Sequence, residues 1–519
     1  MRKDKEMHFR SQSHTLILAC ICLIALAGIH CGGGEDRAYS RGSTVTVLHP
    51  GDERIFTPLR WPAQFLMFLP LVTYDENREL EGRLAKGWEH SPDYREWTFH
   101  LRSDVRWHDG MPVTAHDIKF TIELFAHPDI LVLDQPVESM TVLDDSTLTL
   151  RYTQPTDALN WWFTYYPKHL LKDLEPKEFF EWEFWIRPVG NGPYRYVRHI
   201  PQTMVELEAN ADYYRGKPKI ERVVLKFAES PLTELLGGSV DAAGVERADI
   251  LKLADDPRFR IYDWVFPDVG WLYGVYWNHR DSLFHDSAVR RGLTLAIDRR
   301  ELHHVLNLPT DLPIFDVIFS GRQYRRGELP DPLPYDRKLA SLLLEEAGWR
   351  DVDGDQVLKK DGKEFHFTAL APQEGQLDKA AVYIQAQLRE IGIRMEVQSV
   401  ELSVILRRMQ SRNFQAVLAR VDIGGLRHRT GLFGQGSWIG YENPQVVRLV
   451  EALNITIDPD VRDRMYRELM AIFQADVPIS FLYPLVGTTV AHRRIQGLSS
   501  PWRAHPVAHM EYLWLEDED

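Results

Sequence analysis

Residues 351–355 read Asp-Val-Asp-Gly-Asp, and closely spaced carboxylates of this kind are typical metal ligands. A calcium-binding loop that begins in this way has glycine at its sixth position and a carboxylate at its twelfth. This chain has Gln356 and Gly362 at those positions. The sequence therefore favours simple turns at Asp353-Gly354 and Asp361-Gly362, and it predicts no metal site.

His303 and His304 form the densest histidine pair of the chain. Neighbouring side chains on a helix point about 100° apart, so this pair would be a poor chelate for a metal ion. We therefore interpret both residues as surface histidines.

Motifs that assemble a catalytic site are missing from the sequence. There is no Gly-x-Ser-x-Gly turn, no Gly-x-x-x-x-Gly-Lys phosphate loop and no His-Glu-x-x-His zinc pair. The sequence thus offers no nucleophile and base with a recognisable spacing. It predicts a protein that is not an enzyme and that needs no cofactor.

Cys31 is the cysteine whose position indicates chemistry on its thiol. Basic residues near the start of the chain precede an apolar run at 16–29, which is too short to cross a bilayer as a helix and is typical of a signal peptide. Cys31 follows this run and is itself followed by three glycines. The pattern resembles that of bacterial lipoproteins and predicts that residues 1–30 are removed, that Cys31 is lipidated and that residues 31–43 form a tether.

His30 departs from that pattern, which has a small residue directly before the cysteine. Two alternatives therefore stay open, in which Cys31 is a spectator behind an ordinary cleaved signal or behind an uncleaved signal anchor. All three interpretations export the chain. The expected location is the periplasm or cell envelope, with a membrane anchor in the lipoprotein interpretation.

Composition limits the partners and the architecture. The chain has 519 residues and a formal net charge of -14, which argues against a nucleic-acid partner, since such binding needs a basic face. Hydrophobic residues make up 44% of the chain, an ordinary value for a globular protein of two or three packed units. All three cysteines lie at or before Cys31, so the exported body must be stabilised by its cores.

Strand and helix patterns interleave along the whole chain and predict an α/β fold. Alternating residues predict strands at 44–48 and at 97–101, the latter with Trp97, Phe99 and Leu101 on one face. Thr114 is a predicted N-cap, with Asp117 three residues later. The further elements expected are strands at 204–208 and 221–227 and helices at 115–125, 289–297, 301–306, 338–347, 380–391 and 459–473.

The helix expected at 338–347 is amphipathic. Leu339, Leu342, Leu343 and Ala347 are predicted to share its apolar face, and Gly348 is predicted to cap its C-terminus.

Several segments, taken together and in order, resemble the oligopeptide- and dipeptide-binding family (family 5) of extracellular solute-binding proteins that serve ABC importers. The resemblance extends over about residues 44–500. Its segments are GWEHS at 87–91, WTFHLR at 97–102, WHDGMPVTAHD at 107–117, NGPY at 191–194, NADYY at 210–214, GKP at 216–218, GSVDA at 238–242, DSAVRR at 286–291, AIDR at 296–299, AGW at 347–349, LREIGI at 388–393, GYENP at 440–444 and DVPI at 476–479.

This resemblance implies a periplasmic-binding-protein-like type II fold, with two lobes, a hinge and an inserted extra domain. Hinge motion is expected near residues 268–270 and near Pro484, and the ligand would lie between domains I and III. The implied boundaries are 44–65, 190–269 and 485–519 for the discontinuous domain I, 66–189 for the inserted domain II, and 270–484 for domain III.

Candidate ligand contacts lie beside the expected hinge. Trp271, Tyr273 and Tyr483 are candidates to stack on or hydrogen-bond a solute, with core packing as the alternative for each. In relatives that bind peptides, an aspartate near the position of Asp422 pairs with the amino terminus of the ligand. Arg427, in a basic stretch that replaces the family's usual run, suits a carboxylate or phosphate of the solute, or is a solvated loop residue.

The resemblance implies a monomeric substrate-binding lipoprotein that captures peptides or a similar small polar solute and delivers it to permease subunits in the inner membrane. Two alternatives remain open. One is a solute-sensing or structural lipoprotein on the same scaffold, without transport. The other is an exported hydrolase, which would need a catalytic pair that the sequence does not reveal.

Overall fold

The structure is a computed structural model that describes residues 43–49, 64–75, 79–130, 137–159, 163–265, 271–373, 376–422, 431–499 and 505–516, with the backbone alone for residues 421 and 422. All of these residues belong to one compact unit, Arg41–Asp519. Within these ranges, no helix combines the length and the apolar character needed to cross a membrane.

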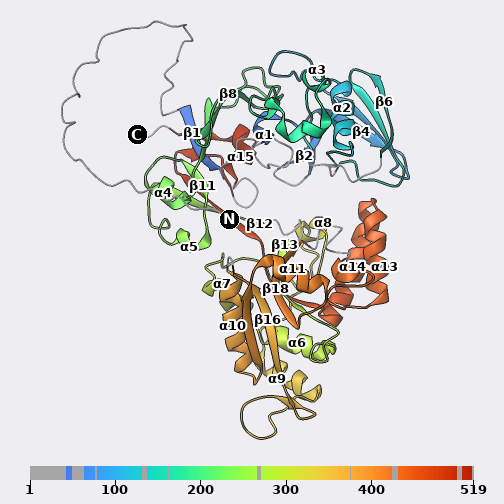
Figure 1. Cartoon of the computed structure of the whole chain (residues 1–519), viewed down its shortest axis with the longest axis vertical. Coiled ribbons are helices and arrows are strands. Elements are labelled where there is room, and N and C mark those ends of the chain that lie inside the picture. Colours follow the sequence, from blue (N-terminus) through green and yellow to red (C-terminus); the bar gives the residue numbers. More distant parts are fainter. Residues whose placement is uncertain are drawn as a thin grey trace, which may run out of the picture. The chain divides into compact units, whose positions relative to one another are not determined.

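A seven-stranded mixed sheet joins strands from three distant stretches of the chain (Figure 1). Its order is β12-β20-β11-β1-β10-β9-β8; β1 pairs in parallel with β10, and β20 runs antiparallel to both β11 and β12. The strands are β1 (Thr44–His49), β8 (Tyr194–Ile200), β9 (Met204–Ala209), β10 (Arg222–Phe227), β11 (Ala242–Gly244), β12 (Phe259–Val265) and β20 (Val486–His492). The short helices α4 (Pro231–Leu236) and α5 (Arg247–Ile250) belong to the same part of the chain.

A five-stranded sheet has the order β17-β16-β18-β13-β19. β13 is antiparallel to both of its neighbours, whereas β16 is parallel to β17 and β18. The strands are β13 (Trp271–Trp277), β16 (His366–Pro372), β17 (Arg394–Val400), β18 (Ala416–Asp422) and β19 (Ile479–Pro484).

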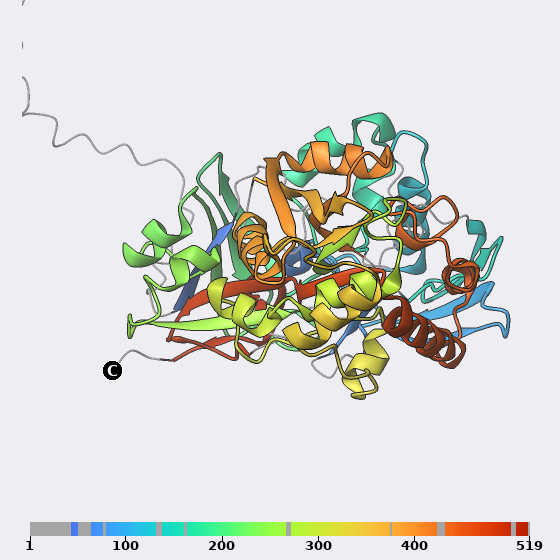
Figure 2. The same ribbon diagram turned by 90° about the horizontal axis from the view of Figure 1, so that it is seen from below.

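Helices pack beside this second sheet, with α10 alongside β16 and β17 and α13 against α14 (Figure 1). Figure 2 shows the same ribbons from below, where α13 and α14 again lie next to each other. The helices are α6 (Ser287–Leu295), α7 (Arg299–Val305), α8 (Gly321–Arg325), α9 (Arg337–Glu346), α10 (Leu377–Arg389), α11 (Leu402–Gln410), α13 (Pro444–Ile455) and α14 (Pro459–Asp476).

A four-stranded antiparallel sheet, β4-β5-β7-β6, lies in the stretch between β1 and β8 and packs against α2. The small elements α1, β2, β3, α3 and two 3₁₀ turns complete this stretch. Its elements are α1 (Gln64–Met67), β2 (Val72–Tyr74), β3 (Leu80–Gly82), β4 (Ala85–His90), β5 (Glu96–Leu101), α2 (Ala115–Phe125), β6 (Val137–Asp144), β7 (Thr147–Tyr152), α3 (Lys168–Leu171), η2 (Pro176–Glu181) and η3 (Glu183–Trp185).

The strand and helix signals at β5 and α2 are confirmed. Trp97, Phe99 and Leu101 are all buried, as their alternation predicts. At the start of α2, the Asp117 carboxylate accepts a hydrogen bond of 2.9 Å from the backbone N–H of Thr114. That contact is one half of a capping box, so the local sequence alone sets where this helix begins.

The predicted apolar face of α9 is partly wrong: Leu343 and Ala347 are half-buried against the core, as predicted, but Leu339 and Leu342 are exposed. Ala340 and Leu344 are the buried residues of this helix, whereas Leu342 is 50% exposed and Leu339 is also exposed. The reason lies in α6, where Gly292 has no side chain. A Cβ atom there would lie 3.3 Å from both the Ala340 carbonyl oxygen and Leu344 Cγ, so α9 approaches α6 along its Ala340 and Leu344 edge.

The C-terminal segment is α15 (Pro506–His509), η5 (Met510–Tyr512) and β22 (Trp514–Leu515), with β22 paired to β21 (Ile495–Gln496). A buried ion pair ties this segment to the stretch after β3, because Arg83 lies 2.7 Å from Glu511. Tyr213 completes the network: its hydroxyl accepts from Arg83 at 2.7 Å and donates to Glu511 at 2.6 Å. Three stretches far apart in the sequence therefore meet at one set of polar contacts.

Candidate functional site

The chain passes twice between the seven-stranded and the five-stranded sheet, and the two passages lie side by side. In the first sheet, the last residue of β12, Val265, is paired with the first residue of β20, Val486. In the second sheet, the backbone N–H of Leu485 donates a 2.8 Å hydrogen bond to the carbonyl oxygen of Trp271, the first residue of β13. The ends of β13 and β19 are therefore held together where both passages occur.

Aromatic side chains gather at these strand ends. Tyr273 and Tyr483 are neighbours in the β13–β19 register, and their ring centroids are 4.7 Å apart with an interplanar angle of 31°. Trp271 lies at the start of β13 and is 39% exposed, whereas Tyr483 is only 4% exposed. The site thus has the accessible indole of Trp271 and the buried phenol of Tyr483, and Tyr273 is half-buried.

Arg420, on β18, adds a positive charge to these rings. Its guanidinium carbon lies 5.0 Å from the centroid of the Trp271 ring, and its backbone is opposite Tyr273 in the β13–β18 register. Such a cation over an aromatic face is attracted by the ring quadrupole, by about 0.5–1 kcal/mol at an exposed site. We call Trp271, Tyr273, Arg420 and Tyr483 the crossover cluster.

The phenols of the crossover cluster stay neutral. Burial raises the pKa of Tyr273, an effect that the charge of Arg420 and its hydrogen bond to the phenol partly offset and that the Glu246 carboxylate reinforces. Burial also raises the pKa of Tyr483 far above its ordinary value. The cluster therefore offers a fixed positive charge, an aromatic face and neutral hydroxyl groups, a combination suited to a polar solute that carries an anionic group.

The structure brings three of the predicted contact residues together, namely Trp271, Tyr273 and Tyr483. The backbone of Asp422 is opposite Trp271 in the β13–β18 register, while its side chain lies outside the described residues. Arg427 lies outside the described residues as well, as does Cys31.

Arg420 is the residue of the crossover cluster that the sequence analysis does not name. A signal for it exists, because Arg420 and Asp422 are two positions apart on one strand, and such side chains share a face of the sheet. The prediction of Asp422 as a ligand contact therefore makes Arg420 a candidate contact as well.

The prediction that His303 lies at the surface is wrong. This side chain is 1% exposed, and its Nε2 lies 3.1 Å from the carbonyl oxygen of Leu482 on β19. Since a carbonyl oxygen only accepts, Nε2 is the nitrogen that carries the proton. The packing of α7 on β19 explains the burial, and it also places the His303 ring edge-on to Tyr483, with centroids 6.2 Å apart. His304 is exposed, as predicted.

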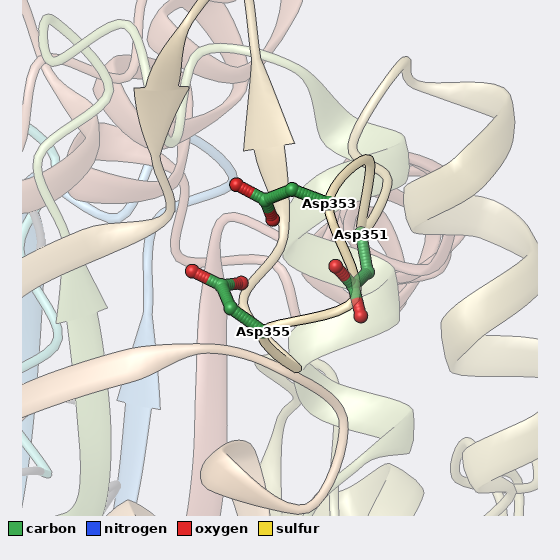
Figure 3. A group of neighbouring side chains, drawn as sticks. All are labelled: Asp351, Asp353 and Asp355. Atoms are coloured by element: carbon green, nitrogen blue, oxygen red, sulfur yellow. The ribbon is translucent and has the colours of Figure 1, made fainter.

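The acidic residues at 351–355 form a loop in which their carboxylates converge (Figure 3). Asp351, Asp353 and Asp355 each place a carboxylate oxygen within 4.8 Å of the others. Lys359 donates hydrogen bonds from Nζ to Asp353 and, at 2.8 Å, to Asp355. Asp351 accepts from the backbone N–H of Gly354 at 2.8 Å. The chain's own donors therefore occupy all three carboxylates.

The turns predicted around this loop are confirmed. Gly354 has a φ of 78°, and Asp361 and Gly362 have φ values of 52° and 76° between the paired strands β14 (Lys359–Lys360) and β15 (Lys363–Glu364). Two consecutive positive φ values define the two-residue hairpin turn for which Asp-Gly is a strong signal. The local sequence therefore explains this hairpin.

The two sheets and the paired passages between them belong to the type II periplasmic-binding-protein fold. The chain belongs to the bacterial extracellular solute-binding proteins of family 5, since the family model described as "Bacterial extracellular solute-binding proteins, family 5 Middle" matches residues 79–434. Both the fold class and the family predicted from the sequence motifs are thus confirmed.

Known relatives are distant, and they match between about half and almost all of the chain. The oligopeptide-binding protein AppA of Bacillus subtilis is 24% identical over 556 aligned residues, which cover 98% of this chain and 99% of that protein. The periplasmic oligopeptide-binding protein OppA of Haemophilus influenzae is 26% identical over 321 residues, which cover 54% of this chain and 57% of that protein.

Solved structures support the same fold. AppA from Bacillus subtilis, in complex with a nonapeptide, has a TM-score of 0.64 and 22% identity, covering 91% of this chain and 99% of that one. NikZ from Campylobacter jejuni, in complex with Ni(L-His), has a TM-score of 0.68 and 23% identity, again covering 91% and 99%. At these identities, the similarity concerns the fold alone.

Proposed function

We propose that this protein is the substrate-binding lipoprotein of an ABC importer, which captures peptides or a similar small polar solute and delivers it to an inner-membrane permease. It acts by binding and release, as a monomer and without catalysis. The observation that carries this proposal is the crossover cluster, in which Trp271, Tyr273 and Arg420 meet at the paired passages between the two sheets. The relatives AppA and OppA are oligopeptide-binding proteins, which supports peptides as the solute.

The chemistry of the cluster favours a solute with a carboxylate and an apolar or aromatic side group. Arg420 would bind the carboxylate through its planar fork of N–H donors, and the Trp271 ring would pack against the side group. Tyr273 would donate or accept one hydrogen bond, while the buried Tyr483 would hold Tyr273 in place. Asp422 and Arg427 remain proposed contacts, for an amino group and for a second anionic group of the solute.

The three-domain division also remains a proposal. Membership of the sheets supports it, because all strands of the seven-stranded sheet fall within the proposed domain I and all strands of the five-stranded sheet within the proposed domain III. Hinge motion would then occur near residues 268–270 and near Pro484, as the family resemblance implies. The signal peptide at 1–30, the tether at 31–43 and the lipid on Cys31 rest on the sequence pattern.

Mass spectrometry of the body purified from Gly32 onward tests this function. The protein is measured in its native state and again after denaturation, which releases any solute that was carried through purification. A released set of peptides supports peptide capture and gives their length, and a single non-peptide mass assigns another solute. If no solute is released and neither peptide nor polar-metabolite pools raise the melting temperature, the proposal fails in favour of a sensing or structural role.

A further inference from the structure

Arg247 is held firmly against the two strands that lead into the passages between the sheets. It is the first residue of α5, and its Nη1 lies 2.5 Å from Asp263 Oδ1 on β12 and 2.8 Å from Thr488 Oγ1 on β20. Asp263 and Thr488 are register partners, and the Thr488 hydroxyl donates to the same carboxylate oxygen at 2.7 Å. These contacts fix the guanidinium on the seven-stranded sheet.

The same guanidinium also reaches the part of the chain that carries the five-stranded sheet. Its Nε donates a 2.9 Å hydrogen bond to the carbonyl oxygen of Asn307, two residues beyond the end of α7. Asn307 follows Leu306, the C-cap residue of α7, so its carbonyl lies just beyond the helix, near the negative end of the helix dipole, where a cation is favoured. Arg247 therefore holds the residue that follows the C-terminus of α7, and it does so from the seven-stranded sheet.

Helix α7, in turn, contacts the crossover cluster. His303 of α7 is bonded to the Leu482 carbonyl oxygen on β19, and its ring meets the edge of Tyr483. Glu246, directly before Arg247, is close enough to the other ring of the cluster to affect Tyr273 electrostatically. The segment 246–247 is thus linked to the cluster in two ways, directly through Glu246 and through α7.

We propose that Arg247 is a latch beside the passages between the sheets. Its contacts stabilise one relative position of the two sheets, namely the position in which α7 supports the crossover cluster. The latch thereby sets how long a solute is retained. Arg247 is a positioning residue that does not touch the solute. A change in the relative position of the two sheets would separate Arg247 from Asn307, because Arg247 is bonded to strands of the seven-stranded sheet and Asn307 follows α7, which packs on β19. A ligand that binds preferentially to one relative position of the two sheets gains affinity from any contact that favours this arrangement.

The latch predicts the effect of two substitutions. Lysine in Arg247→Lys keeps the positive charge beside Asp263, but its single Nζ cannot bond Asp263 and the Asn307 carbonyl in the same geometry. Thr488→Val removes one anchor of the guanidinium and keeps the shape of the side chain. The matched control is Arg258→Lys, because Arg258 pairs with Asp256 at 2.7 Å directly before β12 and, among the described residues, bonds only groups of the proposed domain I.

Distance measurements between two spin labels test the latch. Only the measurement with added ligand rests on the proposed function. The body from Gly32 has no cysteine and contains the compact unit Arg41–Asp519, so labels are introduced cleanly with Ile200→Cys at the end of β8 and Val382→Cys on α10. Distance distributions are recorded without ligand and then with a tryptic digest of casein.

We expect two distance populations, and we expect the population whose distance matches the structure to decrease about fivefold relative to the other in Arg247→Lys, with a change in the same direction in Thr488→Val, because one hydrogen bond is lost. Arg258→Lys should match the parent protein, and the digest should shift every variant toward the population whose distance matches the structure. Equal ratios in Arg247→Lys and the parent, in both arms, would overturn the latch.

If the digest shifts no variant, the proposed peptide function loses its support, while the ligand-free arm still decides on the latch. Should Arg247→Lys fail to fold, as judged by circular dichroism, Thr488→Val takes its place in the comparison, and an unchanged ratio in that variant overturns the proposal.

Discussion

His279 lies in the core, and its Nε2 is 2.9 Å from the carbonyl oxygen of Pro478. Burial lowers the pKa of His279 to about 3, and the nearby charge of Arg290 acts in the same direction. In the unfolded chain, the histidine has its ordinary pKa of about 6.5. As the pH falls below about 6.5, the unfolded state therefore binds a proton that the folded state does not, and the free energy of unfolding decreases.

We predict that His279→Gln reduces the loss of stability between pH 7 and pH 5. Glutamine keeps an N–H donor for the Pro478 carbonyl but does not titrate, which removes a contribution of at most about 1.4 kcal/mol per pH unit. Urea unfolding at the two pH values measures the difference. Burial also lowers the pKa of His108, to about 4. His108 is present in both the variant and the parent protein, so its contribution to the loss of stability is the same in the two. Equal losses in the variant and the parent protein would contradict this account.

Single residues of the site were only partly predictable. Trp271, Tyr273 and Tyr483 could be named because the family resemblance placed the passages between the sheets beside them. The pairing of Arg420 with Trp271 depends on the register of β13 against β18, which involves residues about 150 positions apart in sequence and has no local signal. His303 was misjudged for the same reason, since its burial is due to β19.

At the scale of elements, α9 gives the sharpest contrast between pattern and packing. Leu342 and Leu344 are two positions apart on this helix, yet Leu344 is fully buried and Leu342 is half exposed. Sequence periodicity identified the helix and its end at Gly348, which has a φ of 92°. It did not identify the buried edge, because that edge is selected by the missing side chain of Gly292 on α6.

We predict that Leu344→Ala destabilises the protein by about 2–5 kcal/mol, since it leaves a cavity in the α6–α9 contact. Leu342→Ala, the matched control on the same helix, should change the free energy of unfolding by no more than about 0.5 kcal/mol. Urea unfolding of both variants measures the two changes. A similar decrease in the free energy of unfolding of both variants would show that α9 does not pack through Leu344.

Strands and helix caps were the elements best predicted, because their signals are local. β5 alternates in its own sequence, and Asp117 reaches the backbone of Thr114 within one helical turn. The Asp361-Gly362 hairpin is likewise encoded by two residues with positive φ. In each case, the residues that determine the conformation are neighbours in the chain.

At the scale of the whole molecule, the Arg83–Glu511 ion pair connects residues that no local pattern relates. The side chains are 7% and 10% exposed, and Tyr213 bonds both partners. Breaking a buried pair by removing one charge leaves the other charge buried and uncompensated. The C-terminal segment is therefore expected to contribute to the stability of the entire compact unit.

We predict that Glu511→Gln lowers the free energy of unfolding by about 3–5 kcal/mol. Asp104→Asn is the control, because the more exposed ion pair between Asp104 and Arg102 is expected to contribute at most about 1 kcal/mol to the free energy of unfolding. Thermal and urea unfolding of the two variants provide the comparison. A small, equal effect in both would mean that the C-terminal segment is a peripheral appendage.

The central claim is that solute binds at the crossover cluster. The most direct test compares the parent body from Gly32 with the double variant Trp271→Ala and Arg420→Met, both purified in the same way and analysed by denaturing mass spectrometry for the amount of solute released per protein. Circular dichroism confirms that both are folded.

We predict that the parent protein releases solute and that the double variant, with the same melting temperature in solute-free form, releases less than about a tenth as much, because a charge-assisted hydrogen bond and an aromatic contact are both lost. Equal occupancy in the two proteins would contradict the account and would place the solute elsewhere.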